Sequence, residues 1–349
     1  MSATRSRARG AVWLAAVAIA RGALIGAGVH VLWALGAPSD DATVVEFEIP
    51  RGSGAAQVAR DLRAQGFVRD ARVFLWLLRV EGIDRRIGEG LYDLHRAMDA
   101  RTLAAALERG GRPRTVRVVL PEGSRLVDVA TRLEAAGIAP LTPALERMRA
   151  PEGLLPADAG DADTLEGYLF PAAYDVPLRE PLDATLARMV QRFERELDAA
   201  TRAALDAEGL SVHAWVTLAS MVQAEAANDG EMGIIAGVFR NRLDIGMALQ
   251  SDPTVAYGLG KDLPQLDFPG GDFDVDHPWN TYTRAGLPRG PIGNPGRAAL
   301  DAVLDPDRTD DQGRAWFYFL HGRDADGPVF RPNLDFDGHL RDVARYLRR

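Results

Sequence analysis

One acidic residue stands at the end of a long apolar run, and its position is the strongest sign of chemistry in the chain. Glu225 closes the segment VHAWVTLASMVQAE, in which most residues are apolar. At 3.6 residues per turn, its side chain shares a helix face with Leu218, Met221 and Val222. Burying a carboxylate costs several kcal/mol unless the group is paired or protonated. Because desolvation raises the pKa of a carboxyl toward neutrality, we expect Glu225 to act as a catalytic acid.

The same pattern has a second interpretation, in which Glu225 is a structural carboxylate neutralised by an arginine. Arg240 and Arg242 lie in the segment that follows, and either one could supply the countercharge. The helix pattern alone does not separate the two interpretations, since a paired carboxylate and a protonated one both tolerate burial.

The composition excludes several classes of function. The chain has 349 residues, a net charge of −8 and a pI near 5.4, so it has no basic field that would gather nucleic acid. It contains no cysteine, which removes thiol catalysis and cysteine metal sites. The histidines outside the N-terminal region show no metal-ligand spacing, so we expect neither a metal nor a cofactor.

The N-terminus carries a candidate membrane segment. Residues 11–37 are apolar apart from Arg21 and His30, and three arginines precede them. A helix needs about 20 residues to cross the hydrocarbon core, so we expect a transmembrane helix over 11–37. The charges place the tail 1–10 in the cytoplasm and the rest of the chain outside. A cleaved signal peptide is the alternative, and Arg21 is costly in the middle of a membrane.

The region 43–140 contains two similar segments, VVEFEIPRGSGAAQVARDLRAQGF and VRVVLPEGSRLVDVATRLEAAGI. Each has the pattern of a strand, a turn and a helix. Because one such unit is too small to bury a core, we expect the two copies to pack together. They resemble LysM-like modules of cell-wall proteins. Glycan binding and a simple spacer role are both open for them.

Three long motifs follow in order along the second half of the chain. TLEGYLFPAAYDV begins at Thr164, LASMVQAEAA and VFRNRLDIGMALQSDPTVAYGLG lie between Leu218 and Gly260, and HPWNTYTRAGLPRGPIGNPGRAAL begins at His277. Together they resemble the YceG-like endolytic murein transglycosylases, the MltG family, and the resemblance runs from about Val44 to the C-terminus. The tail AWFYFLHGRDADGPVF reads as two strands about a Gly-rich turn.

The resemblance implies an enzyme of cell-wall biogenesis, a lytic transglycosylase of the carbon–oxygen lyase class. Such enzymes cleave the β-1,4 bond between MurNAc and GlcNAc within nascent peptidoglycan strands. They leave a 1,6-anhydro-MurNAc end and so terminate elongation. The resemblance implies a protein of the inner membrane that crosses it once and has its catalytic domain on the periplasmic side. Glycan strands are the expected partner, together with peptidoglycan synthases or division proteins.

The overall expectation is an α+β fold. It consists of the N-terminal transmembrane helix, the LysM-like small α/β modules, and a mixed α+β catalytic domain over 160–349 with a central apolar helix. The family's catalytic glutamate falls on Glu225. Three departures from the family pattern are Gln223 in place of a second glutamate, Arg289 in place of a second proline, and Pro328 in place of a histidine.

One carboxyl group is enough for this chemistry. A glycoside hydrolase normally uses two carboxylates, about 5–5.5 Å apart for retention and about 6.5–9.5 Å apart for inversion. A lytic transglycosylase can use one glutamate twice: it protonates the leaving O4, then takes the proton of the attacking O6 hydroxyl. A muramidase-type hydrolase that uses water, and a membrane-anchored scaffold that only binds peptidoglycan, are the alternatives.

Polar motif residues are the candidates for binding the substrate. They are Gln250, Ser251 and Asp252 in one loop, Asn280, Thr281 and Tyr282 in another, and Glu166 with Tyr168 in the first motif. Trp279 and Tyr282 offer aromatic faces on which sugar rings can stack. Asp252 has a structural alternative as a helix N-cap before Pro253, and Glu166 has one as a capping or arginine-paired residue.

Overall fold

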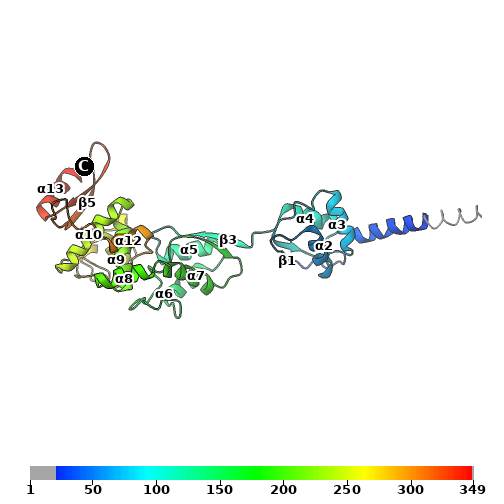
Figure 1. Cartoon of the computed structure of the whole chain (residues 1–349), viewed down its shortest axis with the longest axis horizontal. Helices are drawn as coiled ribbons and strands as arrows, with labels where there is room; N and C mark the ends of the chain where they lie inside the picture. Colours follow the sequence, from blue (N-terminus) through cyan, green and yellow to red (C-terminus); the bar gives the residue numbers. More distant parts are fainter. Residues whose placement is uncertain (1–20, 348–349) are drawn as a thin grey trace, which may run out of the picture. The chain divides into compact units, whose positions relative to one another are not determined.

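The structure is a computed structural model that describes residues 21–347. The chain divides into two compact units, one ending at Arg114 and one beginning at Thr115 (Figure 1). The functional division expected from the sequence, 43–140 for the modules and 160–349 for the catalytic domain, stays a prediction.

The first unit is a two-stranded sheet covered by three helices. Strand β1 (Val45–Ile49) pairs antiparallel with β2 (Gly90–Leu94), and Phe47 lies opposite Tyr92. Alternate residues of both strands are buried, as expected of a sheet with one covered face. The helices that bury this face are α2 (Ala55–Ala64), α3 (Ala71–Val80) and α4 (Ala100–Arg109).

The prediction of a transmembrane helix over residues 11–37 is corrected by the structure. Residues 11–20 of that prediction lie outside the described residues, and residues 21–35 are helical. Within residues 21–347, no helix is both long and apolar enough to cross a membrane. The end of the described helix instead makes polar contacts with the first unit: Arg69 donates to the Trp33 carbonyl at 2.9 Å, and His30 Nε2 lies 3.2 Å from Asp70.

The two strand–turn–helix copies belong to different units. The first copy contributes β1 and α2 to the first unit, where β1 pairs with β2. The second copy contributes β3 (Thr115–Val119) and α5 (Leu126–Ala135) to the second unit, where β3 pairs with β4 (Ala173–Pro177). Each copy therefore completes its core with a strand from further along the chain.

The second unit contains two hydrophobic clusters. The first cluster forms around β3 and β4, which α5, α6 (Leu141–Arg149) and α7 (Leu182–Glu194) cover. The second cluster forms around α9 (Val212–Glu225), which matches the apolar run in the sequence. Around α9 lie α8 (Ala199–Glu208), α10 (Asp229–Asp244) and α12 (Arg297–Leu304), as Figure 1 shows.

Short elements complete the second unit. Helix α11 (Asp252–Leu259) is followed by the turns η1 (Leu263–Gln265) and η2 (Asp272–Asp274). Near the C-terminus, β5 (Tyr318–Arg323) and β6 (Pro328–Asn333) form an antiparallel hairpin, and α13 (Phe336–Tyr346) packs against it. The two strands expected about the Gly-rich turn are thereby confirmed.

Candidate active site

Glu225 is the last residue of α9 and lies in the wall of a cavity. Ser211 caps the start of the helix by accepting a hydrogen bond from the Ala214 amide at 3.1 Å. The chain then leaves the helix after Glu225, and Asn228 caps α10. The cavity, here the Glu225 cavity, has a volume of about 330 Å³ and is lined by Glu225, Arg242, Leu249, Gln250, Asp252, Tyr282, Tyr318, Phe319, Leu320, His321, Phe336 and His339.

The surroundings of Glu225 hold its carboxyl group near the point of half-protonation at neutral pH. Burial, together with the negative charge of Asp252, raises the pKa of Glu225 to about 7. The hydroxyl of Ser251 donates to Glu225 Oε1 at 2.6 Å, and this bond, like the charge of Arg242, lowers the pKa. A group with these properties can donate a proton and take one back.

The two arginines that could have neutralised Glu225 are engaged elsewhere. Arg240 forms a salt bridge with Glu208 at 2.7 Å. Arg242 donates to the carbonyls of Phe317 and Leu249, both at 2.7 Å, and its guanidinium lies over the Tyr318 ring. Neither of them forms a salt bridge with Glu225. The carboxyl group is therefore not a structural partner of a buried arginine.

The loop before α11 is tightly held against the second polar loop. Gln250 has a φ of +52°, the left-handed region that residues other than glycine seldom adopt. The Gln250 amide donates to the Thr281 carbonyl at 3.1 Å, and the Ser251 amide donates to the Thr281 hydroxyl at 2.9 Å. Strained backbone that neighbouring bonds maintain is a common feature of functional sites.

Asp252 is the first residue of α11 and does not cap it. Ser251 occupies the N-cap position, and Pro253 follows Asp252 in the first turn. The Asp252 carboxylate instead accepts a hydrogen bond from the Tyr282 hydroxyl at 2.5 Å. Both side chains lie in the wall of the Glu225 cavity.

Asn280 and Thr281 are buried next to the Glu225 cavity and hold its loops in place through hydrogen bonds. The Asn280 side-chain amide is buried and donates to the carbonyls of Phe273 and Val275 at 2.9 and 2.8 Å. Thr281 is buried as well, and its hydroxyl lies 2.9 Å from that of Thr254. The structure thus brings Glu225, Gln250, Asp252 and Tyr282 to one cavity, bonds Ser251 to Glu225, and leaves Asn280 and Thr281 outside the cavity wall.

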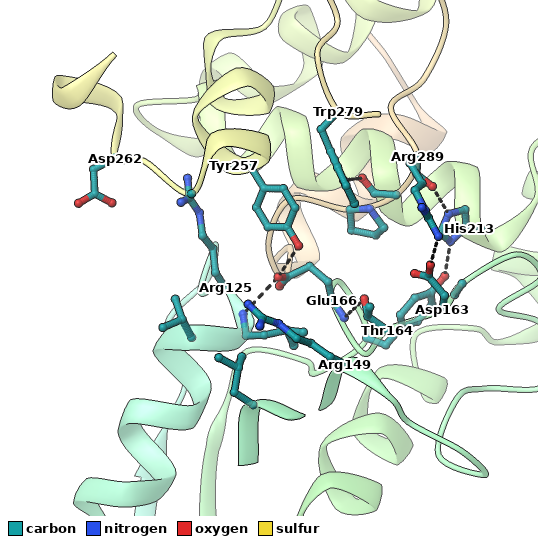
Figure 2. A pocket seen from close by; sticks show the side chains of 18 residues that line it. Arg125, Arg149, Asp163, Thr164, Glu166, His213, Tyr257, Asp262, Trp279 and Arg289 are labelled. Atoms are coloured by element: carbon teal, nitrogen blue, oxygen red, sulfur yellow. Dashed lines mark hydrogen bonds and ion pairs between the residues drawn. The ribbon is translucent and has the colours of Figure 1, made fainter. Parts of the chain in front are cut away.

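Glu166 and Tyr168 line a different cavity of about 560 Å³, here the Glu166 cavity (Figure 2). Tyr168 is buried, and its hydroxyl lies 2.9 Å from His213 Nδ1. Glu166 is only 3% exposed, and its carboxylate accepts hydrogen bonds from the Leu126 amide at 3.2 Å and the Tyr257 hydroxyl at 3.0 Å. Burial raises the pKa of Glu166 to about 7, against the lowering effect of those two bonds.

Sequence reasoning missed the C-terminal wall of the Glu225 cavity. Tyr318 and His321 reach it from β5, and His339 reaches it from α13. The only available signal was the density of aromatic and histidine residues around the Gly-rich turn. Gln223, by contrast, lies outside both cavities and accepts a hydrogen bond from the Gly296 amide at 2.9 Å.

Residues 21–347 contain no cluster of side chains suited to a metal ion. No group of three or more His, Asp or Glu side chains in this range could hold a metal ion.

Comparison with known proteins identifies the family. A model of the YceG-like family matches residues 47–345. An endolytic murein transglycosylase of Bacillus subtilis is 30% identical over 302 residues, which cover 80% of this chain and 79% of that protein. A Streptococcus pneumoniae protein with the same name is 26% identical over 86% of this chain, which spans 58% of its length.

The fold comparison agrees with the sequence comparison. The crystal structure of a YceG-like protein from Listeria monocytogenes matches with a TM-score of 0.57 and 28% sequence identity. The match covers 86% of this chain and 99% of that one. The chain belongs to the YceG-like family.

Proposed function

We propose that the protein is an endolytic murein transglycosylase and that Glu225 is its catalytic acid. The names of its relatives support the activity. The observation that carries the assignment of the residue is the single carboxyl group with a pKa near 7 in the wall of the Glu225 cavity. A group whose pKa lies near the working pH is suited to general acid–base catalysis.

The proposed reaction uses the same carboxyl group in both steps. Glu225 gives its proton to the glycosidic O4 while the bond from this oxygen to the MurNAc anomeric carbon breaks. The Glu225 carboxylate then takes the proton of the MurNAc O6 hydroxyl as O6 bonds to the anomeric carbon. The acid is regenerated, no water is consumed, and the product carries a 1,6-anhydro end.

The neighbours of Glu225 support both forms of the group. After proton donation, the Ser251 hydroxyl and the charge of Arg242 stabilise the carboxylate. The negative charges of Asp252 and Glu225 favour the positive charge that develops on the sugar ring in the transition state. Asp252 is a second carboxylate in the cavity, but the Tyr282 hydroxyl already donates to its Oδ1.

The setting of this reaction follows from its substrate. Murein strands lie outside the cytoplasm, so the enzyme works on the outer face of the cytoplasmic membrane. Nascent strands come from peptidoglycan synthases, which makes synthases and division proteins the expected partners. The first unit is expected to bind glycan or to act as a spacer.

Replacing Glu225 by glutamine tests the proposal. On purified glycan strands, Glu225→Gln should lose at least 100-fold in cleavage rate, because proton transfer by a positioned side chain contributes about 10²–10⁴-fold. Glu194→Gln, on the exposed side of α7, is the control and should cleave normally. Mass spectrometry should find anhydro ends in the wild-type products.

Three results would change the assignment. Full activity of Glu225→Gln would exclude the residue as the acid. Products with reducing ends would favour a muramidase-type hydrolase. Absence of cleavage by the wild-type protein would favour a scaffold that only binds peptidoglycan.

A further inference from the structure

The Glu166 cavity has the features of a ligand site that the proposed reaction does not use. Its volume of about 560 Å³ exceeds that of the Glu225 cavity, and it lies entirely within the second unit. Figure 2 shows the Glu166 carboxylate below the Tyr257 hydroxyl, with Arg125 on one side and the Arg289–Asp163 pair on the other.

Two guanidinium groups in this wall are available to a ligand. Arg125 donates to the Lys261 carbonyl at 3.2 Å and lies over the Tyr257 ring, and Arg149 is exposed at the end of α6. Among residues 21–347, neither guanidinium forms a salt bridge with a carboxylate. A guanidinium binds a carboxylate through two parallel hydrogen bonds, so this wall suits a carboxylate ligand.

Two acidic residues of the wall, Asp163 and Glu166, are engaged within the protein. Asp163 is paired with Arg289. Asp262 lies just before the short helix η1, and it is exposed. The Glu166 carboxylate receives hydrogen bonds from Leu126 and Tyr257. Arg125 and Arg149 form no salt bridge with these carboxylates, although the charge of Arg125 lowers the pKa of Glu166.

The rest of the wall is apolar or aromatic. The rings of Tyr257 and Trp279 lie 5.4 Å apart in a tilted arrangement. Small and aliphatic side chains complete the lining, namely Leu126, Val127, Leu145, Ala162 and Pro291. A ligand that fits both parts carries a carboxylate next to small apolar groups, as a short peptide with methyl side chains does.

The position of the cavity links it to the proposed reaction. Helix α11 begins at Asp252, in the wall of the Glu225 cavity, and its end contributes Tyr257 to the Glu166 cavity. At 1.5 Å per residue, the helix is about 12 Å long. The loop residues Trp279 and Tyr282 likewise line one cavity each. A strand cut at an internal bond extends past the Glu225 cavity, and its side-chain peptides extend from it.

We propose that the Glu166 cavity binds a carboxylate of the peptide carried by the murein strand, through Arg125 and Arg149. This proposal rests on the proposed function, since murein strands carry short acidic peptides that contain alanine. The cavity would make the enzyme select strands that still bear their peptides over bare glycan.

Binding measurements on the full chain test this inference. The protein carries Glu225→Gln, so that strands stay intact, and is titrated with uncrosslinked strands that bear their peptides and with strands stripped by an amidase. Adding Arg125→Gln and Arg149→Gln should weaken binding of peptide-bearing strands about 10-fold or more, because hydrogen bonds between a guanidinium and a carboxylate are stronger than those between neutral groups. Binding of stripped strands should stay unchanged.

Two further variants serve as checks on this result. Arg149→Gln alone alters an exposed residue and should give part of the loss without disturbing the fold. Arg132→Gln, on the exposed side of α5, is the matched control and should bind both substrates as before. In the variants that retain Glu225, the effect should lie in KM for peptide-bearing strands, with kcat unchanged.

The possible outcomes separate this inference from the proposed function. Equal weakening on both substrates would mean that the cavity binds sugar or is structural, and would overturn the inference. Unchanged binding on both would overturn it as well. Failure of the wild-type protein to cleave strands would contradict the proposed function, while the binding data would still decide on the peptide site.

Discussion

At the scale of single residues, the behaviour of Glu225 depends on a few neighbours that act in opposite directions. Burial and Asp252 raise the pKa of its carboxyl group, whereas Ser251 and Arg242 lower it. The proposed reaction requires the protonated form, so the rate of cleavage should fall as the pH rises through about 7. The position of this fall can be moved by changing one neighbour at a time.

Replacing Ser251 by alanine removes a hydrogen bond that stabilises the Glu225 carboxylate. The pKa of Glu225 should rise, and the alkaline limb of kcat/KM against pH should move up by about one unit. Asp252→Asn removes a negative charge and should move the same limb down, while Tyr282 can still donate to the new amide oxygen. If the two substitutions moved the alkaline limb in the same direction, this explanation of the pKa of Glu225 would be wrong.

At the scale of elements, helix α10 positions the hairpin that lines one side of the Glu225 cavity. Asn241 donates to the carbonyls of Arg308 and Trp316, both at 2.8 Å, and so holds the segment that leads into β5. The same segment passes very close to α10 at Gly237. A Cβ at this position would meet the Asp307 carbonyl oxygen at 2.0 Å.

Gly237→Ala should therefore lower the free energy of unfolding by about 1–3 kcal/mol, because backbone cannot move aside as a side chain can. Gly233→Ala on the same helix is the matched control, since its Cβ would lie 3.6 Å from the nearest atom. That variant should be neutral or more stable by up to about 1 kcal/mol, given the helix propensity of alanine. Urea denaturation measures both, and equal destabilisation would contradict the close approach.

At the scale of the whole second unit, Glu166 lies where the two hydrophobic clusters meet. Its carboxylate receives donors from Leu126 at the start of α5 and from Tyr257 in α11. Leu126 belongs to the cluster around β3 and β4, whereas Tyr257 packs against the cluster around α9. One buried carboxyl group therefore joins the two halves of this unit.

The raised pKa of Glu166 makes this junction sensitive to pH. The native state binds the proton more tightly than the unfolded state, so the stabilisation is complete below about pH 4.5 and is lost as the pH rises to about 7. One pKa unit corresponds to about 1.4 kcal/mol, so the loss is on the order of 3 kcal/mol. Glu166→Gln cannot ionise and should lose less stability than the wild-type protein between pH 5 and pH 8.

Thermal unfolding at the two pH values measures this difference. Glu194→Gln serves as the control and should retain the pH dependence of the wild-type protein. If Glu166→Gln showed the same loss between pH 5 and pH 8 as the wild-type protein, the native carboxyl would not hold its proton near neutrality.

Local patterns predicted the elements of the site correctly. The apolar run that ends at Glu225 is α9, and the two strands about the Gly-rich turn are β5 and β6. The motifs predicted the YceG-like family. Periodicity and turn residues succeed here because each reports on the burial of a residue relative to its near neighbours. The same approach was wrong for residues 11–37, since no helix within residues 21–347 is both long and apolar enough to cross a membrane.

The amino-acid sequence by itself therefore determined which helix carries Glu225, the proposed acid, and to which family the chain belongs. Only the tertiary structure decided that Arg240 pairs with Glu208. It also decided that Tyr318 and His339 line the Glu225 cavity, and that Glu166 lines a separate cavity. These are contacts between segments far apart in the chain. They depend on how whole elements pack, which no local pattern records.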